Sequence, residues 1–581
     1  MSKPRSYLMT VYKRLFRYVI PHWKIVPAAL IGMILVASSN AYIPFLMSQV
    51  IGILEEDGRA SGSLLIPLIL FITFVVRGFA DFMAVYGLNW LGRAVIHDLR
   101  EDIFQHYTKL PSAFYDLNSS GSLVSKLTYN TEQVSEAISN VVVVGIRDSL
   151  TIIVLIGAMI YFSPALTTMV AVAAPIVGWL ISLMSKAFRR YGLRIQTSMG
   201  DATRVTEEAL SAHRIVKVFE GQEHQKKQFS EINERNRKQF MKLVAASAAG
   251  DMLTQYTVTA AVTAMIAVAF SGLLIQDLGA SVFIGFLTAM GMTLAPLKRI
   301  ININAALQRG IAAGLTLFET IDEPVERDAG TKKIDRARGE IKFKDLSFGY
   351  QNSETKVLNN INLFVPAGSS LAIVGRSGAG KSTLVGLLPR FYDVDTGQVC
   401  LDGIDVREYR LKDLRRQVSL VSQDVILFDD SIANNIAYGL LADSPRADIE
   451  AAAEAAYVKE FADELPDGLD SPVGQRGALL SGGQRQRIGI ARALYKGGEV
   501  LILDEATNSL DMETEKNIVR TINNLDRNIT LLIIAHNLST IEGCDQLVIV
   551  KDGNIVNKGI YDEVIKTHDF KKISGDLSYL R

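Results

Sequence analysis

The feature that most constrains the fold of this chain is an ungapped match to the phosphate-binding pattern G-x-x-x-x-G-K-[ST], which runs Gly375-Arg376-Ser377-Gly378-Ala379-Gly380-Lys381-Ser382-Thr383. An apolar run at 370–374 predicts a buried strand before it, and a helical pattern follows at 383–388. Glycines let backbone N–H groups turn towards an anion, the helix N-terminus adds partial positive charge, and the Lys381 ammonium adds a full charge. The pattern therefore predicts an α/β nucleotide-binding domain.

The first half of the chain is too apolar for a soluble domain. The chain has 581 residues, of which 49% are hydrophobic, and its mean hydropathy is +0.20. Six apolar segments are each long enough to cross a hydrocarbon layer of roughly 30 Å, which takes about 20 helical residues. We place these segments near 24–50, 64–91, 138–162, 165–186, 248–272 and 278–303. The first is uncharged over 25–54, which is too long for a secretory signal, so we interpret it as a retained membrane helix.

Charge is distributed unevenly, although the net charge is zero because 61 Lys and Arg balance 61 Asp and Glu. This balance gives no reason to expect nucleic acid as a partner. The long connection 187–247 is rich in Lys and Arg, which places it in the cytoplasm by the positive-inside rule. Six spans then place both termini in the cytoplasm. The two cysteines, Cys400 and Cys544, suggest no disulfide framework and fit a reducing compartment.

Two long connections, 92–137 and 187–247, have a helical pattern and are expected to extend the membrane helices into the cytoplasm. We expect their tips, near 114–125 and 207–218, to contact another part of the protein; the alternative is that both are solvated helical hairpins. Composition changes near 322, where a charged linker at 322–338 begins. The predicted domains are therefore a transmembrane domain at 1–321 and a nucleotide-binding domain at 339–581.

Two carboxylates follow an apolar strand pattern at 500–503. Asp504 is expected to bind the magnesium shell together with Ser382, and Glu505 is expected to orient or deprotonate the attacking water. An Asp-Glu pair at a strand end is weak evidence alone, but it becomes strong evidence in the same domain as a phosphate loop.

Another Gly-rich motif, Leu480-Ser481-Gly482-Gly483-Gln484, precedes a helical run. Here the sequence resembles the ATP-binding cassette (ABC) family, whose signature is LSGGQ. The resemblance implies that Ser481, Gly482, Gly483 and Gln484 bind the ATP held by the phosphate loop of a partner chain. Glycines and a serine at a helix N-terminus suit an anion, whereas the alternative is a Gly-rich helix cap.

Further residues match the cassette in order. The resemblance implies that Tyr350 stacks on adenine, that Gln423 contacts magnesium and water, and that His536 lies near the γ-phosphate. Departures occur where the family commonly reads SALD and RLST, because this chain has Asn508-Ser509-Leu510-Asp511 and Asn537-Leu538-Ser539-Thr540. Neither departure replaces a residue that we assign to chemistry.

The resemblance also implies a homodimer. One chain carries one phosphate loop, one signature and six predicted spans, whereas transporters of this family work with two cassettes head to tail and twelve spans. The expected fold class is therefore an all-α six-helix transmembrane domain of the ABC exporter type followed by an α/β P-loop cassette domain. Each ATP would lie between Lys381 of one chain and Ser481 of the other.

Charged residues within the apolar segments are candidates for substrate binding, because unpaired ions in hydrocarbon are costly. Arg77 and Arg147 are expected to face a central cavity and attract an anionic lipid; the alternative is ion pairing that only supports packing, with Asp81 four residues after Arg77. Lys298 and Arg299 are expected to reach cytoplasmic water, where Lys298 could assist.

Along its whole length the chain is similar to bacterial ABC exporters that flip lipid A. The matching stretches are Val76-Arg77-Gly78, Ala295-Pro296-Leu297-Lys298, Gln308-Arg309-Gly310, Phe391-Tyr392-Asp393 and Ala433-Asn434-Asn435-Ile436-Ala437-Tyr438. The resemblance implies an inner-membrane flippase for lipid A with its core sugars, although Ala295 stands where a basic residue is common. The alternatives are a multidrug or general phospholipid exporter and an ATP-gated channel or regulator, and the presence of Glu505 argues against the last.

Overall fold

The computed structural model describes residues 13–57, 65–271, 279–350, 353, 355–439, 445–506, 510, 512–523, 529–534 and 541–566. These residues form two compact units. The first contains the described residues up to Thr108 together with Gly121–Glu323, and the second contains Lys109–Ser120 together with the described residues from Pro324 onward. The short segment Lys109–Ser120 therefore belongs to the second unit, although it interrupts the first in sequence.

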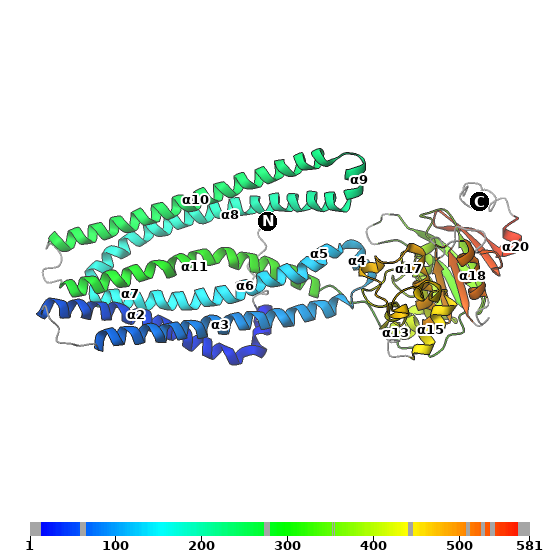
Figure 1. Cartoon of the computed structure of the whole chain (residues 1–581), viewed down its shortest axis with the longest axis horizontal. Helices are drawn as coiled ribbons and strands as arrows, with labels where there is room; N and C mark the ends of the chain where they lie inside the picture. Colours follow the sequence, from blue (N-terminus) through cyan, green and yellow to red (C-terminus); the bar gives the residue numbers. More distant parts are fainter. Residues whose placement is uncertain are drawn as a thin grey trace. The chain divides into compact units, whose positions relative to one another are not determined.

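The first unit is built from helices (Figure 1). These are η1 (Ile20–Ile25), α2 (Val26–Asp57), α3 (Leu65–Tyr107), α5 (Ser120–Ser125), η2 (Lys126–Asn130), α6 (Thr131–Val142), η3 (Val143–Asp148), α7 (Ser149–Phe162), α8 (Pro164–Ser211), α9 (His213–Val218), α10 (Gln222–Ser271) and α11 (Ala280–Ile321). Apart from terminal residues, the six predicted apolar segments all lie within these helices. Four described stretches are long and apolar enough to cross a membrane: Lys13–Ile53, Leu65–Tyr107, Ser120–Phe162 and Ala280–Ile300. The total of six spans stays a prediction.

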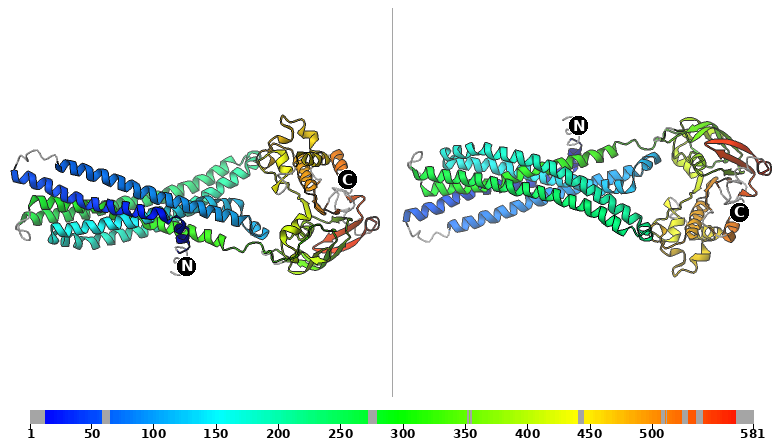
Figure 2. Two further views of the ribbon diagram at one scale, coloured as in Figure 1. Left: turned by 90° about the horizontal axis from the view of Figure 1, so that it is seen from below. Right: turned by 90° about the horizontal axis from the view of Figure 1, so that it is seen from above.

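The helices of the two long connections continue well beyond the apolar segments. Figures 1 and 2 show α8 and α10 side by side, with α9 joining them at one end. In the other connection and the apolar segment that follows it, α5, α6 and α7 are joined through η2 and η3, which are π-helical turns. Such turns add a residue to a helical turn and occur frequently at functional sites.

A single residue separates α7 from α8 and divides one long apolar stretch into two helices. Ser163 has an extended backbone, and its side chain accepts a hydrogen bond from the Leu166 N–H at 3.3 Å. Pro164 occupies the first turn of α8, where its missing N–H costs little. The pair therefore ends one helix and begins the next.

Helices α2 and α3 pack closely through small residues. A Cβ atom at Gly32 would come within 2.7 Å of the Ala80 carbonyl oxygen and 3.0 Å of the Ala84 nitrogen. Both alanines are fully buried. Small residues at such contacts let helix backbones approach, which is how membrane helices gain packing energy without a hydrophobic driving force.

The second unit contains two sheets. A four-stranded sheet has the order β2-β1-β4-β5 and a six-stranded sheet the order β10-β9-β3-β8-β7-β6. The strands are β1 (Ile341–Phe348), β2 (Leu358–Val365), β3 (Ser370–Val374), β4 (Thr396–Leu401), β5 (Ile404–Asp405), β6 (Val418–Val421), β7 (Val500–Asp504), β8 (Thr530–Ile534), β9 (Gln546–Lys551) and β10 (Asn554–Ile560). The described helices are α4 (Ser112–Leu117), α12 (Lys381–Gly386), η4 (Val406–Glu408), α13 (Leu411–Arg416), α14 (Ile432–Ile436), α15 (Arg446–Ala455), α16 (Lys459–Ala462), η6 (Gly468–Asp470), η7 (Gln475–Gly477), α17 (Gly482–Lys496), α18 (Met512–Asn523) and α20 (Tyr561–Val564).

The central strands of the six-stranded sheet are buried on both faces, which explains why they are continuously apolar. Ile502 of β7 packs into one core with β1 and α12, whereas its neighbours Leu501 and Leu503 pack into another core with α15 and α17. Strands β6, β7, β8, β3 and β9 are parallel. Their carboxyl ends therefore meet at one edge.

The Gly32 contact predicts that one substitution has opposite effects at two glycines. Gly32→Ala should lower the thermal unfolding midpoint in detergent, because the added methyl meets backbone atoms of α3 and overpacking costs about 1–3 kcal/mol. Gly157→Ala on α7, where the described structure leaves the Cβ position open, should raise the midpoint, because alanine favours a helix over glycine by about 1 kcal/mol. Equal shifts in the two variants would contradict the packing described here.

Candidate nucleotide site

The predicted nucleotide residues lie at the carboxyl edge of the six-stranded sheet. Ile373 of β3 and Asp504 of β7 are both in register with Ile534 of β8. The phosphate loop and Glu505 follow directly after β3 and β7. This edge is where ligands bind in open parallel sheets.

The phosphate loop has a backbone that needs glycine. Gly380 has a φ of +98°, in the left-handed region that side chains rarely adopt, and it forms the cap of α12. A Cβ at Gly375 would lie 2.2 Å from the Val550 carbonyl oxygen. The positive φ at Gly380 and the lack of space for a Cβ at Gly375 explain why the sequence pattern requires glycine at these two positions.

Lys381 is buried and folded back on the loop that precedes it. Its Nζ donates to the carbonyl oxygens of Gly375 at 3.0 Å and Arg376 at 3.1 Å. Burial lowers the pKa of Lys381, and the nearby Glu505 and Asp504 carboxylates partly oppose this shift. The ammonium is therefore held inside the loop, where a phosphate would be bound.

The structure brings the predicted metal and water residues into two hydrogen-bonded pairs. The Ser382 hydroxyl donates to Asp504 Oδ1 at 3.0 Å, and Gln423 Nε2 donates to Glu505 Oε2 at 2.7 Å. Glu505 has a φ of +52°, unusual for a residue with a side chain, and its N–H donates to the Ile534 carbonyl at 2.9 Å. This strained position is typical of functional sites.

Gln486 is a supporting residue that sequence reasoning missed. Its side chain is buried, and its Nε2 donates to the Glu505 carbonyl oxygen at 3.1 Å. The bond fixes the turn that holds the Glu505 carboxylate. In sequence, Gln486 is one more polar residue in a helix, so no pattern distinguished it.

The donor set fits magnesium. A hydroxyl, a side-chain amide and a carboxylate come from Ser382, Gln423 and Asp504, and oxygen atoms are the ligands that magnesium prefers. No group of three or more His, Cys, Asp or Glu residues suited to a metal occurs in the described part of the chain. An ion at this edge would therefore take its other ligands from phosphate and water.

Tyr350 lies beside the phosphate loop and belongs to a cluster of three aromatic residues. Its hydroxyl is 3.0 Å from the Thr383 Oγ1, and its ring meets those of Phe348 and Tyr392 edge to face at centroid distances of 5.1 and 5.2 Å. The Tyr392 hydroxyl in turn donates to Asp116 Oδ2 of α4 at 2.7 Å. Burial and this bond raise the pKa of Tyr392, so the hydroxyl remains a donor at neutral pH.

The link between Tyr392 and Asp116 was not foreseen from sequence. The tip of the first long connection was expected to contact another part of the protein, and α4 does so within the second unit. Tyr392 and Asp116 are 276 residues apart, and no pattern in the sequence pairs them.

The signature residues lie at the N-terminus of α17. Ser481 caps this helix: its Oγ accepts from the Gln484 N–H at 3.2 Å, and its own N–H donates to Gln484 Oε1 at 2.8 Å. Gly482 and Gly483 form the first turn of α17. His536 and the departures at Asn508, Ser509 and Asn537 lie outside the described residues.

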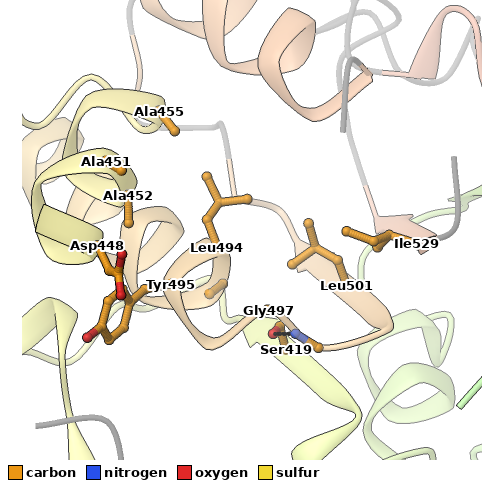
Figure 3. Close-up of a pocket in the computed structure, with 12 residues that line it drawn as sticks. Ser419, Asp448, Ala451, Ala452, Ala455, Leu494, Tyr495, Gly497, Leu501 and Ile529 are labelled. Carbon is orange, nitrogen blue, oxygen red and sulfur yellow. Dashed lines mark hydrogen bonds between the residues drawn. The ribbon is translucent and has the colours of Figure 1, made fainter. Parts of the chain in front are cut away.

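A cavity of about 420 Å³ in the second unit lies elsewhere (Figure 3). Its walls include Ala451, Leu494, Tyr495, Leu501 and Ile529. Leu501 lies near the beginning of β7, whereas the nucleotide residues follow its end. The cavity is therefore at the opposite edge of the sheet from the phosphate loop.

The candidate substrate residues of the first unit have different surroundings. Arg147 is mostly buried and binds Asp81 at 2.8 Å and Asp148 at 3.1 Å. Arg77 lies over the Phe74 ring, with the guanidinium carbon 5.8 Å from the centroid. Asp81 thus pairs with Arg147 of η3, rather than with Arg77 on its own helix.

Arg299 has an ion partner that was not predicted. Its side chain is 46% exposed and its Nε donates to Asp148 Oδ2 at 2.6 Å, and its access to cytoplasmic water stays a prediction. Lys298 is exposed on α11. Ala295, the position that lacks the basic residue common in similar exporters, lies one helical turn before Arg299.

Comparison with known proteins agrees with this architecture. Residues 26–297 match the ABC transporter transmembrane region, and residues 358–508 match the ABC transporter family. The chain is 43% identical to an ATP-dependent lipid A-core flippase of Nitrosococcus oceani, over 96% of this chain and 93% of the relative. It is 42% identical to an ATP-dependent lipid A-core flippase of Idiomarina loihiensis, over 96% of both chains.

The chain therefore belongs to the ABC transporters, within the family that these flippases form. It is a multi-pass membrane protein whose second unit is an ATP-binding ABC ATPase domain. A solved structure of a bacterial Atm1-family ABC exporter with ATP bound has the same fold, with a TM-score of 0.81 and 24% identity over 96% of this chain and 98% of that chain. The predicted order of a helical membrane domain and an α/β cassette is confirmed.

The Tyr392–Asp116 bond predicts a variant that weakens the response of the ATPase to the membrane. Tyr392→Phe should leave basal ATP hydrolysis in detergent within about twofold of the wild type. It should reduce the stimulation of hydrolysis on reconstitution into liposomes, because it removes the hydrogen bond to Asp116 of α4. A hydrogen bond to a charged group contributes about 1.5–3 kcal/mol. Asp116→Ala should have the same effect, and the double variant should be no worse than either single variant.

Tyr409→Phe is the matched control for this experiment. It removes a tyrosine hydroxyl that donates to the Leu401 carbonyl at 3.1 Å, also within the second unit. A loss of stimulation in Tyr409→Phe equal to that in Tyr392→Phe, or additive effects of the two substitutions in the cycle, would contradict a specific role for the bond to α4.

Proposed function

We propose that this chain is one half of a homodimeric ATP-driven flippase that moves lipid A with its core sugars from the inner to the outer leaflet of the bacterial inner membrane. The observation that carries the proposal is similarity over nearly the full length to ATP-dependent lipid A-core flippases. The nucleotide residues that we assign within one chain, apart from His536, lie in hydrogen-bonded arrangements at one sheet edge. The proposal also includes six membrane spans and the location of both termini in the cytoplasm.

Each residue at the sheet edge has a step to perform in ATP hydrolysis. Lys381 and the loop N–H groups bind the phosphates, and Tyr350 offers an aromatic ring to adenine. Ser382, Asp504 and Gln423 would hold magnesium, which neutralises phosphate charge when bound. Glu505, held by Gln423 and by the Gln486 bond to its carbonyl, orients the attacking water and accepts its proton, and we expect His536 near the γ-phosphate.

Exposed apolar side chains on both units support assembly with a second copy. Around α9 the most exposed are Leu210, Ile215, Val218 and Phe219, with exposed fractions of 61–78%. On the second unit, Phe428 and Tyr438 stack with centroids 4.3 Å apart and remain half exposed beside Ile426. Clustered apolar surface of this kind marks protein interfaces, and a second copy would supply a matching face for each.

The composite site predicts which mixed dimers retain activity. In the proposed composite site, Lys381 of one chain works with Ser481 of the other. A dimer of a Lys381→Ala chain and a Ser481→Arg chain then has both defects in the same site, and its other site is intact. A dimer of a Lys381→Ala/Ser481→Arg chain with a wild-type chain has a defect in each site. ATPase activity of differently tagged, purified mixed dimers should therefore be higher for the first dimer than for the second.

The reverse order would show that each chain uses its own signature, and equal activities would remove the composite site from the proposal. Glu505→Gln in both chains serves as the inactive control, because it removes the proton acceptor while leaving ATP binding intact.

The cargo is tested by transport in liposomes. Lipid A should stimulate ATP hydrolysis and change leaflets in an ATP-dependent manner, whereas simple phospholipids should do so less. Arg77→Ala/Arg147→Ala should lose most of the lipid A response, because Arg binds phosphate oxygens bidentately. Lys298→Ala is expected to have a smaller effect, because its side chain is exposed.

A multidrug exporter is the second candidate, and exposed aromatic residues on α3 favour it. Phe79, Phe82 and Tyr86 are each about 60% exposed and would suit an apolar cargo. Hydrophobic cations therefore belong in the same assay. Stimulation by cations equal to that by lipid A, or an unchanged response of the double variant, would favour this candidate.

A further inference from the structure

Four charged residues of the first unit form one network, which we call the charge network: Asp81 of α3, Arg147 and Asp148 of η3, and Arg299 of α11. Arg147 donates from Nη1 to Asp81 at 2.8 Å and from Nε to Asp148 at 3.1 Å. Arg299 donates to both oxygens of Asp148, at 2.6 and 3.1 Å. Two cations and two carboxylates therefore link three helices with no net formal charge.

The charge network has a buried half and an exposed half. The Asp148 side chain is 1% exposed and that of Arg147 is 14% exposed. The side chains of Asp81 and Arg299 are 49% and 46% exposed. Because half-exposed ions are costly in hydrocarbon, the exposed half belongs on a water-accessible side of the helices. A soluble headgroup can reach the network from that side.

The helices are locally weakened where the network joins them. Residues Arg147 and Asp148 close a π-helical turn, and Pro296 interrupts the backbone hydrogen bonds of α11 one turn before Arg299. The Arg299–Asp148 bonds tie these two irregular places together. A ligand that removes these bonds frees both helices at points where they bend most readily.

Resting on the proposed function, we propose that a lipid phosphate monoester exchanges with the carboxylates of the charge network, and that Arg299 is a further substrate-contacting residue. The phosphate takes Arg299 from Asp148 and the Arg147 Nη1 from Asp81. Arg147 keeps its Nε bond to Asp148, so the buried carboxylate never lacks a cation. The headgroup thus replaces two direct interhelical bonds: α3 loses its bond to η3, and α11 is joined to η3 only through the phosphate.

Charge arithmetic favours a phosphate monoester over a carboxylate. A phosphate monoester carries a charge of about −1.5 to −2 and three acceptor oxygens. It can therefore accept from Arg299 and from the Arg147 Nη1 at once, two donors that are bound by two different carboxylates, Asp148 and Asp81, in the charge network. Asp148 acts as a positioning residue that holds Arg147 and Arg299 close together before the lipid arrives.

The exchange is tested by titrating the full-length protein in nanodiscs with lipid A, with dephosphorylated lipid A and with inorganic phosphate, following binding by tryptophan fluorescence. Arg299→Gln should raise the half-saturating concentration of lipid A about tenfold and leave that of dephosphorylated lipid A unchanged. Asp148→Asn should lower it several-fold, because the competing carboxylate is removed. Inorganic phosphate should bind far more weakly than lipid A, because it lacks the acyl chains.

Arg309→Gln is the matched control. Arg309 also lies on α11 and forms a partly exposed ion pair, with Glu136 at 3.7 Å, so its loss changes the charge of the helix without touching the network. If Asp148→Asn does not fold, Asp148→Asn/Arg299→Gln removes one cation together with the carboxylate and should bind lipid A as Arg299→Gln does.

A distance measurement tests the release of the helices. Spin labels at Ile146→Cys and Leu294→Cys, on η3 and α11, should show a broader distance distribution with lipid A in the wild type, and without lipid in Asp148→Asn. The native Cys400 and Cys544 are buried and should escape labelling.

Three results would overturn the exchange. These are wild-type lipid A affinity in Arg299→Gln, equal shifts for the phosphorylated and dephosphorylated lipids, and inorganic phosphate binding as tightly as lipid A. If lipid A stimulates and binds the wild type while Arg299→Gln is unaffected, the proposed flippase function stands and the exchange alone fails. If the wild type does not respond to lipid A, both fail.

Discussion

The cost of keeping charge away from bulk water is the constraint on which both units depend. In the second unit, the buried Lys381 ammonium is held by two loop carbonyls, and two carboxylates lie close enough to oppose the lowering of its pKa. In the first unit, the buried Asp148 is held by two arginines from different elements. In each case a charge that would otherwise be expelled is retained because polar or oppositely charged partners compensate it.

Sequence reasoning predicted the parts of the fold that depend on local patterns. The phosphate loop, the apolar strand before Asp504 and the signature each combine a motif with the strand or helix that the motif requires, and the structure places them on those elements. The buried strands were readable because a parallel sheet covered on both faces needs apolar residues at every position. The expectation of a contact element near the tip of the first long connection agrees with α4, where Asp116 accepts a hydrogen bond from Tyr392 of the same unit.

Pairings between distant residues could not be predicted in this way. Arg299 lies near the end of a predicted apolar segment, and nothing in that stretch indicated that α11 continues past it and brings it to Asp148, 151 residues earlier in the chain. Gln486 and Tyr392 are ordinary polar and aromatic residues until the fold places them beside Glu505 and Asp116. Such contacts depend on the packing of whole elements, which no single stretch of sequence encodes. The place of His536 remains a prediction.

The grouping of Lys109–Ser120 with the second unit changes how motion can pass along this molecule. The chain crosses between the units at Thr108–Lys109, at Ser120–Gly121 and at Glu323–Pro324, not only at the linker. A body tethered by one flexible joint can swivel without disturbing its neighbour, but each additional attachment removes a freedom of rotation. The ATPase unit is therefore attached to the first unit at three points of the chain. Its rotation requires the ends of α3, α5 and α11 to move together.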